Sequence, residues 1–232
     1  MIDEFLAHAK EAFPNEACGV VVKAGKRKTR VIRCRNVSDT PAETFEIDTD
    51  DYAAAEEIGE IVGIFHSHPN NSAEPSQADL SMCEVTGVPW HIVSWPQAGY
   101  RYVEPSGYVA PLEGRPFVYG VHDCFTLVRD YCARHLGIQV PEFDHGRHGW
   151  WNRGGNLYMD NLEAAGFVVV SDLKPQDALL MQFDAQVPHH AAIYLGDNTI
   201  LQHMDGRLSG KTFYGEYYQK VTRFIVRHKS LC

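Results

Sequence analysis

The chain has 232 residues, of which 44% are hydrophobic and 22% are charged, and its formal net charge is −9. This composition is normal for a globular protein, and the length allows one large or two small domains. The acidic balance and the lack of a long basic run exclude nucleic acid as the main partner, because phosphate binding needs clustered lysine and arginine.

The N-terminal segment 1–14 is amphipathic and lacks the basic and apolar regions of a signal peptide. No apolar run approaches the ~18 residues that indicate a membrane span. We therefore expect the protein to be made and folded in a cytoplasm, with no membrane span. The six cysteines are then expected to be mostly reduced, and the absence of a Cys-x-x-Cys pair argues against a zinc ribbon.

Periodicity in the first half predicts alternating helices and strands. In chain order these are a helix over 3–12, strands over 18–23 and 29–35 around a polar hairpin at 24–28, a strand over 43–47, a helix over 49–60, a buried strand over 61–65, a helix over 76–85 and a buried strand over 91–95. Proline and glycine are dense between Pro96 and Pro116, which indicates a linker at about 105–115.

The second half begins with a strongly amphipathic helix over 123–136. A loop rich in tryptophan and glycine over 149–155, a helix over 156–165 and strands over 167–170, 178–183, 190–195, 199–203 and 220–227 follow. The chain is thus predicted to be α+β, with domains at 1–104 and 116–232 joined by the linker.

The strongest motif is His66-Ser-His68, followed by Ser76-x-x-Asp79. Two histidines two residues apart on an extended segment face the same side, and Asp79 in the next helix can complete a His-His-Asp set. Three protein ligands with an open fourth position are typical of catalytic zinc. Glu16 is a candidate general base, and Ser76 is a candidate hydrogen-bond donor to an oxyanion. The same spacing also fits a purely structural histidine pair.

These residues resemble the signature of the JAB1/MPN metalloproteases (JAMM), in which His-x-His is followed after seven residues by Ser-x-x-Asp. The segment 14–19 also resembles that family's N-terminal motif. The resemblance covers about residues 1–103 and implies a cytidine-deaminase-like sheet flanked by helices. It further implies hydrolysis of amide or isopeptide bonds, with Zn²⁺ bound by His66, His68 and Asp79, Glu16 as the base and Ser76 as the oxyanion stabiliser.

The second half offers a cysteine and candidate histidine partners. Asp123 is a good N-cap, which places Cys124 in the first helical turn, where the helix dipole favours a thiolate. A buried structural cysteine is the alternative. A histidine at 189 or 190 can take the thiol proton, and His203 on the next strand can orient it.

Asp123-Cys124 and the run from His190 to Tyr194 resemble the NlpC/P60 cysteine peptidases. The resemblance covers about residues 116–227, favours His190 over His189 as the base and puts His203 at the family's third polar position. It implies a papain-like fold, with a helix packed on an antiparallel sheet, and cleavage of bacterial cell-wall stem peptides between D-glutamyl and diamino-acid residues. The Ser-Gly that often follows the cysteine is Phe-Thr here.

A JAMM domain joined directly to an NlpC/P60 domain is similar to a family of tail-tip assembly proteins of long-tailed phages. This resemblance implies assembly in the host cytoplasm, a place in the virion tail tip and action in the periplasm or cell wall. The implied partners are other tail-tip proteins and a peptidoglycan peptide substrate. The leading hypothesis is a bifunctional hydrolase. A structural or chaperone component with dispensable sites is the alternative, and a deubiquitinase-like enzyme is a third hypothesis that the second domain disfavours.

Overall fold

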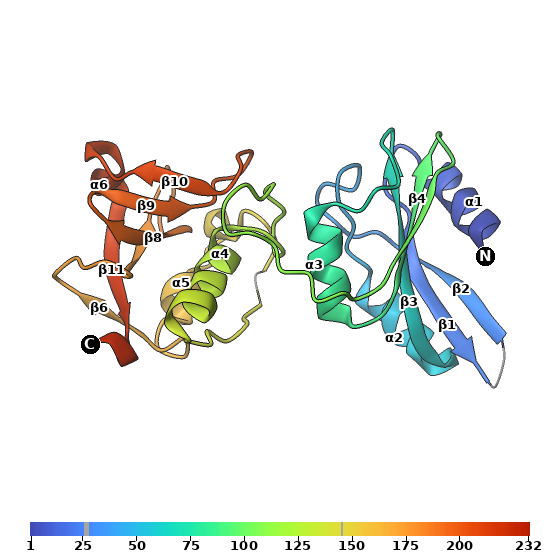
Figure 1. Cartoon of the computed structure of the whole chain (residues 1–232), viewed down its shortest axis with the longest axis horizontal. Coiled ribbons are helices and arrows are strands. Elements are labelled where there is room, and N and C mark those ends of the chain that lie inside the picture. The colour runs from blue at the N-terminus through green and yellow to red at the C-terminus, as the bar shows by residue number, and fades with distance from the viewer. Residues whose placement is uncertain (26–27, 145) are drawn as a thin grey trace. The chain divides into compact units, whose positions relative to one another are not determined.

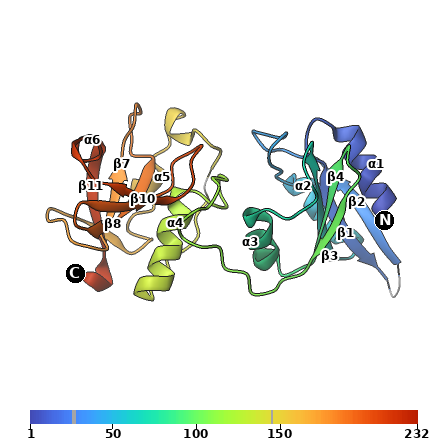
Figure 2. The same ribbon diagram turned by 45° about the horizontal axis from the view of Figure 1, so that its top comes forward.

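The structure, a computed structural model, describes residues 1–25, 28–144 and 146–232. The chain forms two compact units, Met1–Val109 and Ala110–Cys232. Each unit is a sheet with helices packed on it (Figures 1 and 2), and the predicted α+β class is confirmed. Two residues of the predicted hairpin, 26 and 27, lie outside the described ranges. Within those ranges, no helix has the length and apolar character needed to cross a membrane.

The first unit contains a five-stranded sheet with the strand order β2-β1-β3-β4-β5. Strands β3 and β4 are parallel, and the other neighbours are antiparallel. The elements are α1 (Ile2–Ala12), β1 (Cys18–Ala24), β2 (Lys28–Cys34), α2 (Thr49–Ile58), β3 (Glu60–Pro69), α3 (Gln77–Thr86), β4 (Trp90–Trp95) and β5 (Tyr100–Val103).

Helices cover both faces of this sheet. Phe5 of α1 is buried in the core on one face. On the other face, Ala55 of α2 and Cys83 of α3 pack with Ile64 of β3. Burial on both faces explains why the central strands are continuous apolar runs. Side chains alternate along a strand, so His66 shares the face of Ile64 and points to the side on which α3 lies.

The second unit contains a six-stranded antiparallel sheet with the order β10-β9-β8-β7-β11-β6. Leu127 of α4 packs with Ala191 on one face, and Tyr218 of α6 packs with Ala192 on the other. The elements are α4 (Cys124–Tyr131), a π-helical turn (Cys132–Leu136), a 3₁₀ turn (Trp150–Asn152), α5 (Leu157–Asp160), β6 (Phe167–Val170), β7 (Ala178–Met181), β8 (His190–Gly196), β9 (Thr199–Gln202), β10 (Gly210–Phe213), α6 (Glu216–Val221), β11 (Thr222–His228) and a 3₁₀ turn (Lys229–Leu231).

The predicted strand over 43–47 is wrong. Apart from one isolated bridge between Asn36 and Ile47, the segment forms turns and irregular structure. The reason is the side-chain amide of Asn36, which donates to the carbonyl of Thr44 at 3.0 Å and accepts from the N–H of Glu46 at 3.1 Å. A side chain therefore takes the backbone groups that a neighbouring strand would otherwise pair.

Several other predicted boundaries also differ. The helix predicted over 156–165 is α-helical only over 157–160, where the Asn161 side chain donates to the Leu157 carbonyl at 2.9 Å. The helix predicted over 123–136 ends in the π-helical turn. Strands β5 and β10 and helix α6 were not predicted, and α6 occupies the start of the strand predicted over 220–227.

We predict that Asn36→Ala lowers the free energy of unfolding of the first unit. Its amide group also donates to the Glu16 carbonyl at 3.1 Å and accepts from Ser38 N–H at 3.0 Å, so the change leaves several backbone groups unpaired. The expected loss is about 1–3 kcal/mol. Urea unfolding followed through amide NMR signals of residues 1–109 measures it. The matched control is Asn15→Ala at an exposed position, and equal stabilities of the two variants would contradict the prediction.

Two candidate hydrolytic sites

The first site is positioned by the pairing of β1 with β3. Cys18 lies opposite His66 in this antiparallel register. Ser67 N–H donates to the Ala17 carbonyl at 2.9 Å, and Ala17 N–H donates to the Ser67 hydroxyl at 2.8 Å. These bonds keep the two chains aligned for one more residue, which brings Glu16 opposite His68. Residues directly opposite each other share a face of the sheet. The register therefore places Glu16 on the same face as both histidines.

Three side-chain groups form a tight triangle on this face. His66 Nε2 lies 3.0 Å from His68 Nε2 and 3.2 Å from Asp79 Oδ1, and His68 Nε2 lies 3.4 Å from Asp79 Oδ2. In tetrahedral zinc sites with Zn–N distances of about 2.0–2.1 Å, the ligand atoms are about 3.3 Å apart. His68 Nδ1 donates to the Ser72 carbonyl at 2.8 Å, which leaves the Nε2 lone pair for a metal. The donor set thus fits Zn²⁺.

The third member of the triangle comes from the first turn of α3. Asp79 Oδ2 accepts the Ser76 N–H at 2.7 Å, and Ser76 Oγ accepts the Asp79 N–H at 3.1 Å, so the predicted capping box is present. Burial opposes ionisation of Asp79, but His66 and His68 outweigh it and hold the carboxyl pKa well below its usual range. Because Ser76 Oγ acts as the acceptor in the box, its own proton can still be donated to a substrate oxygen.

Glu16 is the fourth group on this face and is 7% exposed. Burial raises the pKa of its carboxyl, and the nearby charges of His66 and His68 oppose that shift. A raised pKa makes this carboxylate a stronger base than an exposed glutamate. The ring of Phe45 stacks on the His66 ring with centroids 4.6 Å apart, which fixes the orientation of the imidazole.

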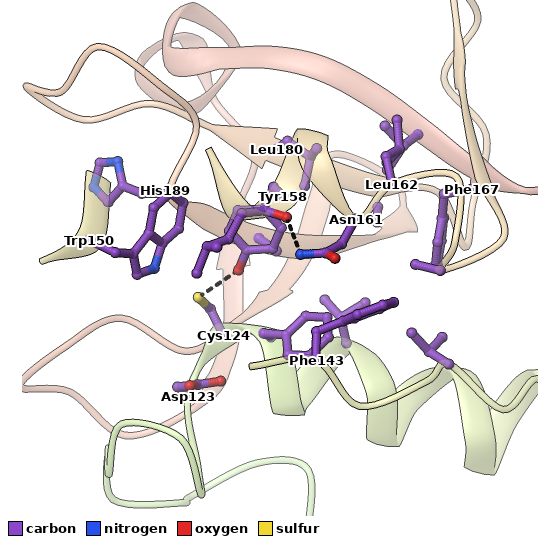
Figure 3. A pocket seen from close by; sticks show the side chains of 18 of the residues that line it. Asp123, Cys124, Phe143, Trp150, Tyr158, Asn161, Leu162, Phe167, Leu180 and His189 are labelled. Carbon is purple, nitrogen blue, oxygen red and sulfur yellow. Dashed lines mark hydrogen bonds between the residues drawn. The ribbon is translucent and has the colours of Figure 1, made fainter. Parts of the chain in front are cut away.

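The second site begins at the N-terminus of α4. Asp123 Oδ1 accepts the Thr126 N–H at 2.9 Å, and Thr126 Oγ1 accepts the Asp123 N–H at 2.8 Å, which completes a second capping box. Cys124 is therefore held as the first helical residue. Its Sγ lies 3.2 Å from the Tyr158 hydroxyl, as the dashed line in Figure 3 shows. The hydroxyl was not among the groups that the sequence pointed to.

The expected thiolate at Cys124 is not favoured in this structure. Burial and the neighbouring Asp123 carboxylate raise the pKa of the thiol to about 12, against weaker opposing effects of the Tyr158 hydroxyl and the Ala191 N–H. The dipole of one short helix does not overcome the cost of a charge in a low-dielectric surrounding. In the resting state Cys124 is a neutral thiol.

His190, the first residue of β8, is oriented by Gln202. His190 Nε2 lies 3.1 Å from Gln202 Oε1, and Gln202 Nε2 donates to the Tyr218 hydroxyl at 2.9 Å. With the amide oxygen as acceptor, the ring carries its proton on Nε2 and has its lone pair on Nδ1. Burial lowers the pKa of His190 to about 4, so the ring is neutral at pH 7 and can accept a proton.

The third polar position is occupied by Gln202, not by the predicted His203. In the β8–β9 hairpin Ala192 pairs with Gln202, and the register shifts between Tyr194 and Gly196. Side chains alternate, so Gln202 shares the face of His190, whereas His203 belongs to the opposite face. The buried His203 ring instead meets the Phe117 ring edge-on at 5.2 Å. The structure therefore hydrogen-bonds His190 to Gln202, while His203 acts on His190 only through a weaker electrostatic effect that lowers the pKa of the ring.

The structure does not join Cys124 to His190 by a hydrogen bond. In the described part of the chain, the side chain that hydrogen-bonds to the thiol is Tyr158. The Ala191 N–H, one residue after His190, does interact with the thiol. Catalytic hydrogen bonds are often long without substrate and tighten in the complex. The ring of His189 stacks flat on Trp151, with centroids 4.6 Å apart.

A largely apolar pocket of about 830 Å³, including its open part, adjoins Cys124. Figure 3 shows the Trp150 ring next to the thiol, His189 beyond that ring and Phe143 on the other side of Cys124. Leu162, Phe167 and Leu180 line the interior.

Comparison with known proteins gives the class of each half. Residues 1–104 match the prokaryotic homologues of the JAB domain (Prok-JAB), and residues 114–227 match the NlpC/P60 family. The first half is also 30% identical over 118 residues to a desampylase of Haloferax volcanii, a match covering 45% of this chain and 76% of the relative. The chain thus combines two domains of peptidase families.

The whole chain is similar to phage proteins that share the name tail tip assembly protein K. It is 41% identical over 234 residues to the tail tip assembly protein K of Escherichia phage N15, covering 99% of this chain and 95% of the relative. It is also 41% identical over 184 residues to the tail tip assembly protein K of Escherichia phage lambda, covering 78% and 88%. The chain belongs to the family of tail tip assembly proteins K.

We predict that His68→Ala removes tight zinc binding by the first site. The change deletes one of three ligands, whereas His8→Ala in α1 leaves the triangle intact and serves as the matched control. Equilibrium dialysis with metal analysis should give about one zinc ion per chain for the control, as expected for a single three-ligand site, and far less for His68→Ala. Equal zinc contents would contradict the assignment.

We also predict that free Cys124 alkylates slowly at neutral pH. With a thiol pKa of about 12, the thiolate fraction and hence the rate should rise about tenfold per pH unit between pH 7 and 10, without a plateau. Peptide-resolved mass spectrometry of iodoacetamide labelling reads Cys124 separately from the exposed Cys232. A plateau below pH 9 would show a resting thiolate and contradict the prediction.

Proposed function

We propose that this tail tip assembly protein is a hydrolase with two centres. Its second domain is an endopeptidase for peptidoglycan stem peptides and acts during genome entry through the cell wall, with Cys124 as nucleophile and His190 as base. Its first domain is a zinc-dependent amide or isopeptide hydrolase. The observation that carries the proposal is the bond between His190 and Gln202, because it sets the tautomer of a neutral imidazole on the strand whose next residue, Ala191, interacts with the helix-capped thiol.

In the second domain the steps follow from the two neutral groups. His190 Nδ1 takes the thiol proton as Cys124 Sγ attacks the scissile carbonyl carbon, and the carbonyl electron pair moves to oxygen. Collapse of this intermediate breaks the C–N bond, and the imidazolium gives its proton to the leaving amine. Water, deprotonated by the same imidazole, then hydrolyses the thioester and restores the thiol. Gln202 holds the ring in place throughout.

In the first domain the chain's own groups would bind and orient the reactants. His66, His68 and Asp79 would hold Zn²⁺, which when bound acidifies water and polarises a carbonyl. Glu16 would accept the proton of the attacking water and pass it to the leaving amine. The Ser76 hydroxyl would donate to the carbonyl oxygen as negative charge develops there.

The matching prediction compares single variants on purified peptidoglycan. Cys124→Ala and His190→Ala should each lower the release of stem-peptide fragments by at least about 1,000-fold, because each removes a reacting group. Gln202→Ala should lower it less, because that side chain only orients the base. Mass spectrometry of the released fragments measures the rates and locates the cleaved bond.

His189→Ala tests which histidine is the base, and His68→Ala tests whether the first site contributes to the cleavage of peptidoglycan. His189→Ala should cost less than His190→Ala, and the reverse order would reassign the base. His68→Ala should leave the Cys124-dependent fragments unchanged. If Cys124→Ala releases fragments as fast as the parent chain, the peptidase proposal fails. If a double variant, Cys124→Ala with His68→Ala, still yields infectious particles, catalysis is dispensable and a structural role in the tail tip replaces the hydrolase proposal.

A further inference from the structure

Tyr158 lies against the proposed nucleophile, and the proposed reaction does not yet use it. Its hydroxyl is 3.2 Å from Cys124 Sγ. The phenol ring is held by edge contacts with Phe125 and Trp150, with centroids 6.3 and 6.1 Å away. The short helix α5 that carries it is supported by the bond from Asn161 to the Leu157 carbonyl. The hydroxyl is therefore positioned by the contacts of its ring with two other aromatic side chains.

The reaction leaves one charge to be stabilised. When sulfur attacks a carbonyl carbon, the developing oxyanion lies two bonds from Sγ. A donor already within hydrogen-bonding distance of Sγ is therefore within reach of that oxygen. Burial raises the phenol pKa of Tyr158 well above its usual value, so the O–H stays protonated. In a low-dielectric pocket such a donor is worth more than in water.

We propose that Tyr158 is a catalytic residue of the second site, whose O–H donates a hydrogen bond to the oxyanion formed when Cys124 attacks the substrate carbonyl. The proposal rests on Cys124 being the nucleophile. The proton is shared and not transferred: the oxyanion keeps its charge until the intermediate collapses, and Tyr158 ends the cycle as a neutral phenol. Before substrate binds, the Tyr158 hydroxyl and the Cys124 thiol share a hydrogen bond in which either group can be the donor.

The test compares two reactions of Cys124, and only one of them forms an oxyanion. Acylation by 4-nitrophenyl acetate passes through a tetrahedral oxyanion, whereas alkylation by iodoacetamide does not. Tyr158→Phe should lower the ratio of acylation rate to alkylation rate by about 100-fold, the usual effect of removing one such donor. Tyr214→Phe, which removes a hydroxyl bonded to Thr222 at 3.0 Å on the other face of the sheet, is the matched control and should leave the ratio unchanged.

Each other outcome overturns the proposal in a distinct way. Equal falls in the acylation and alkylation rates would mean that Tyr158 only increases the reactivity of the Cys124 thiol. Equal rises in both rates would mean that Tyr158 only decreases that reactivity. Replacing Tyr158 by 3-fluorotyrosine keeps the ring shape and strengthens the donor, so the ratio should rise, and a fall would count against the role. If Cys124→Ala keeps the acylation burst, the nucleophile assignment fails, together with the role of Tyr158. Failure to cut peptidoglycan affects only the proposed substrate.

Discussion

Both candidate sites depend on a capping box at the first turn of a helix. The first N–H groups of a helix have no partner within it, and the box satisfies two of them with side-chain oxygens. In α3 the carboxylate of Asp79 closes the box and also lies within 3.4 Å of both histidines. The start of the helix and the assembly of the candidate metal site therefore use the same atoms. In α4 the box places Cys124 at the first helical position.

Local patterns were enough to predict the groups that lie close together in sequence. His66 and His68 share a face because they are two residues apart on one strand, and Asp79 follows from the helix that Ser76 begins. The position of Glu16 beside them depends instead on β1 pairing with β3 in one particular register. Nothing in the local pattern specifies that register. Glu16 was a candidate base from the residues, and the family resemblance supported that role. Most helices and strands were predicted for the same local reasons.

The residues and the strand that the sequence predicted wrongly or missed all depend on long-range contacts or on an irregular turn. Gln202 and His203 are adjacent, and the register shift in the β8–β9 hairpin decides which of them faces His190. Side chains alternate with a period of two, so an error of one residue reverses the face. Tyr158 is 34 residues from Cys124, and no spacing rule connects them. The strand expected over 43–47 failed because the side chain of Asn36 takes the Thr44 carbonyl and the Glu46 N–H.

The two candidate sites differ in when their charges exist. Asp79 is ionised in the resting structure, so the first site presents a permanent negative group between two imidazoles, which suits the binding of a cation. Burial keeps Cys124 and His190 neutral at pH 7, so charge in the second site arises only as sulfur attacks. Groups that bind only that transient charge lower the barrier without stabilising the ground state. Changes in the first site should therefore act mainly through metal binding, and changes in the second mainly through kcat.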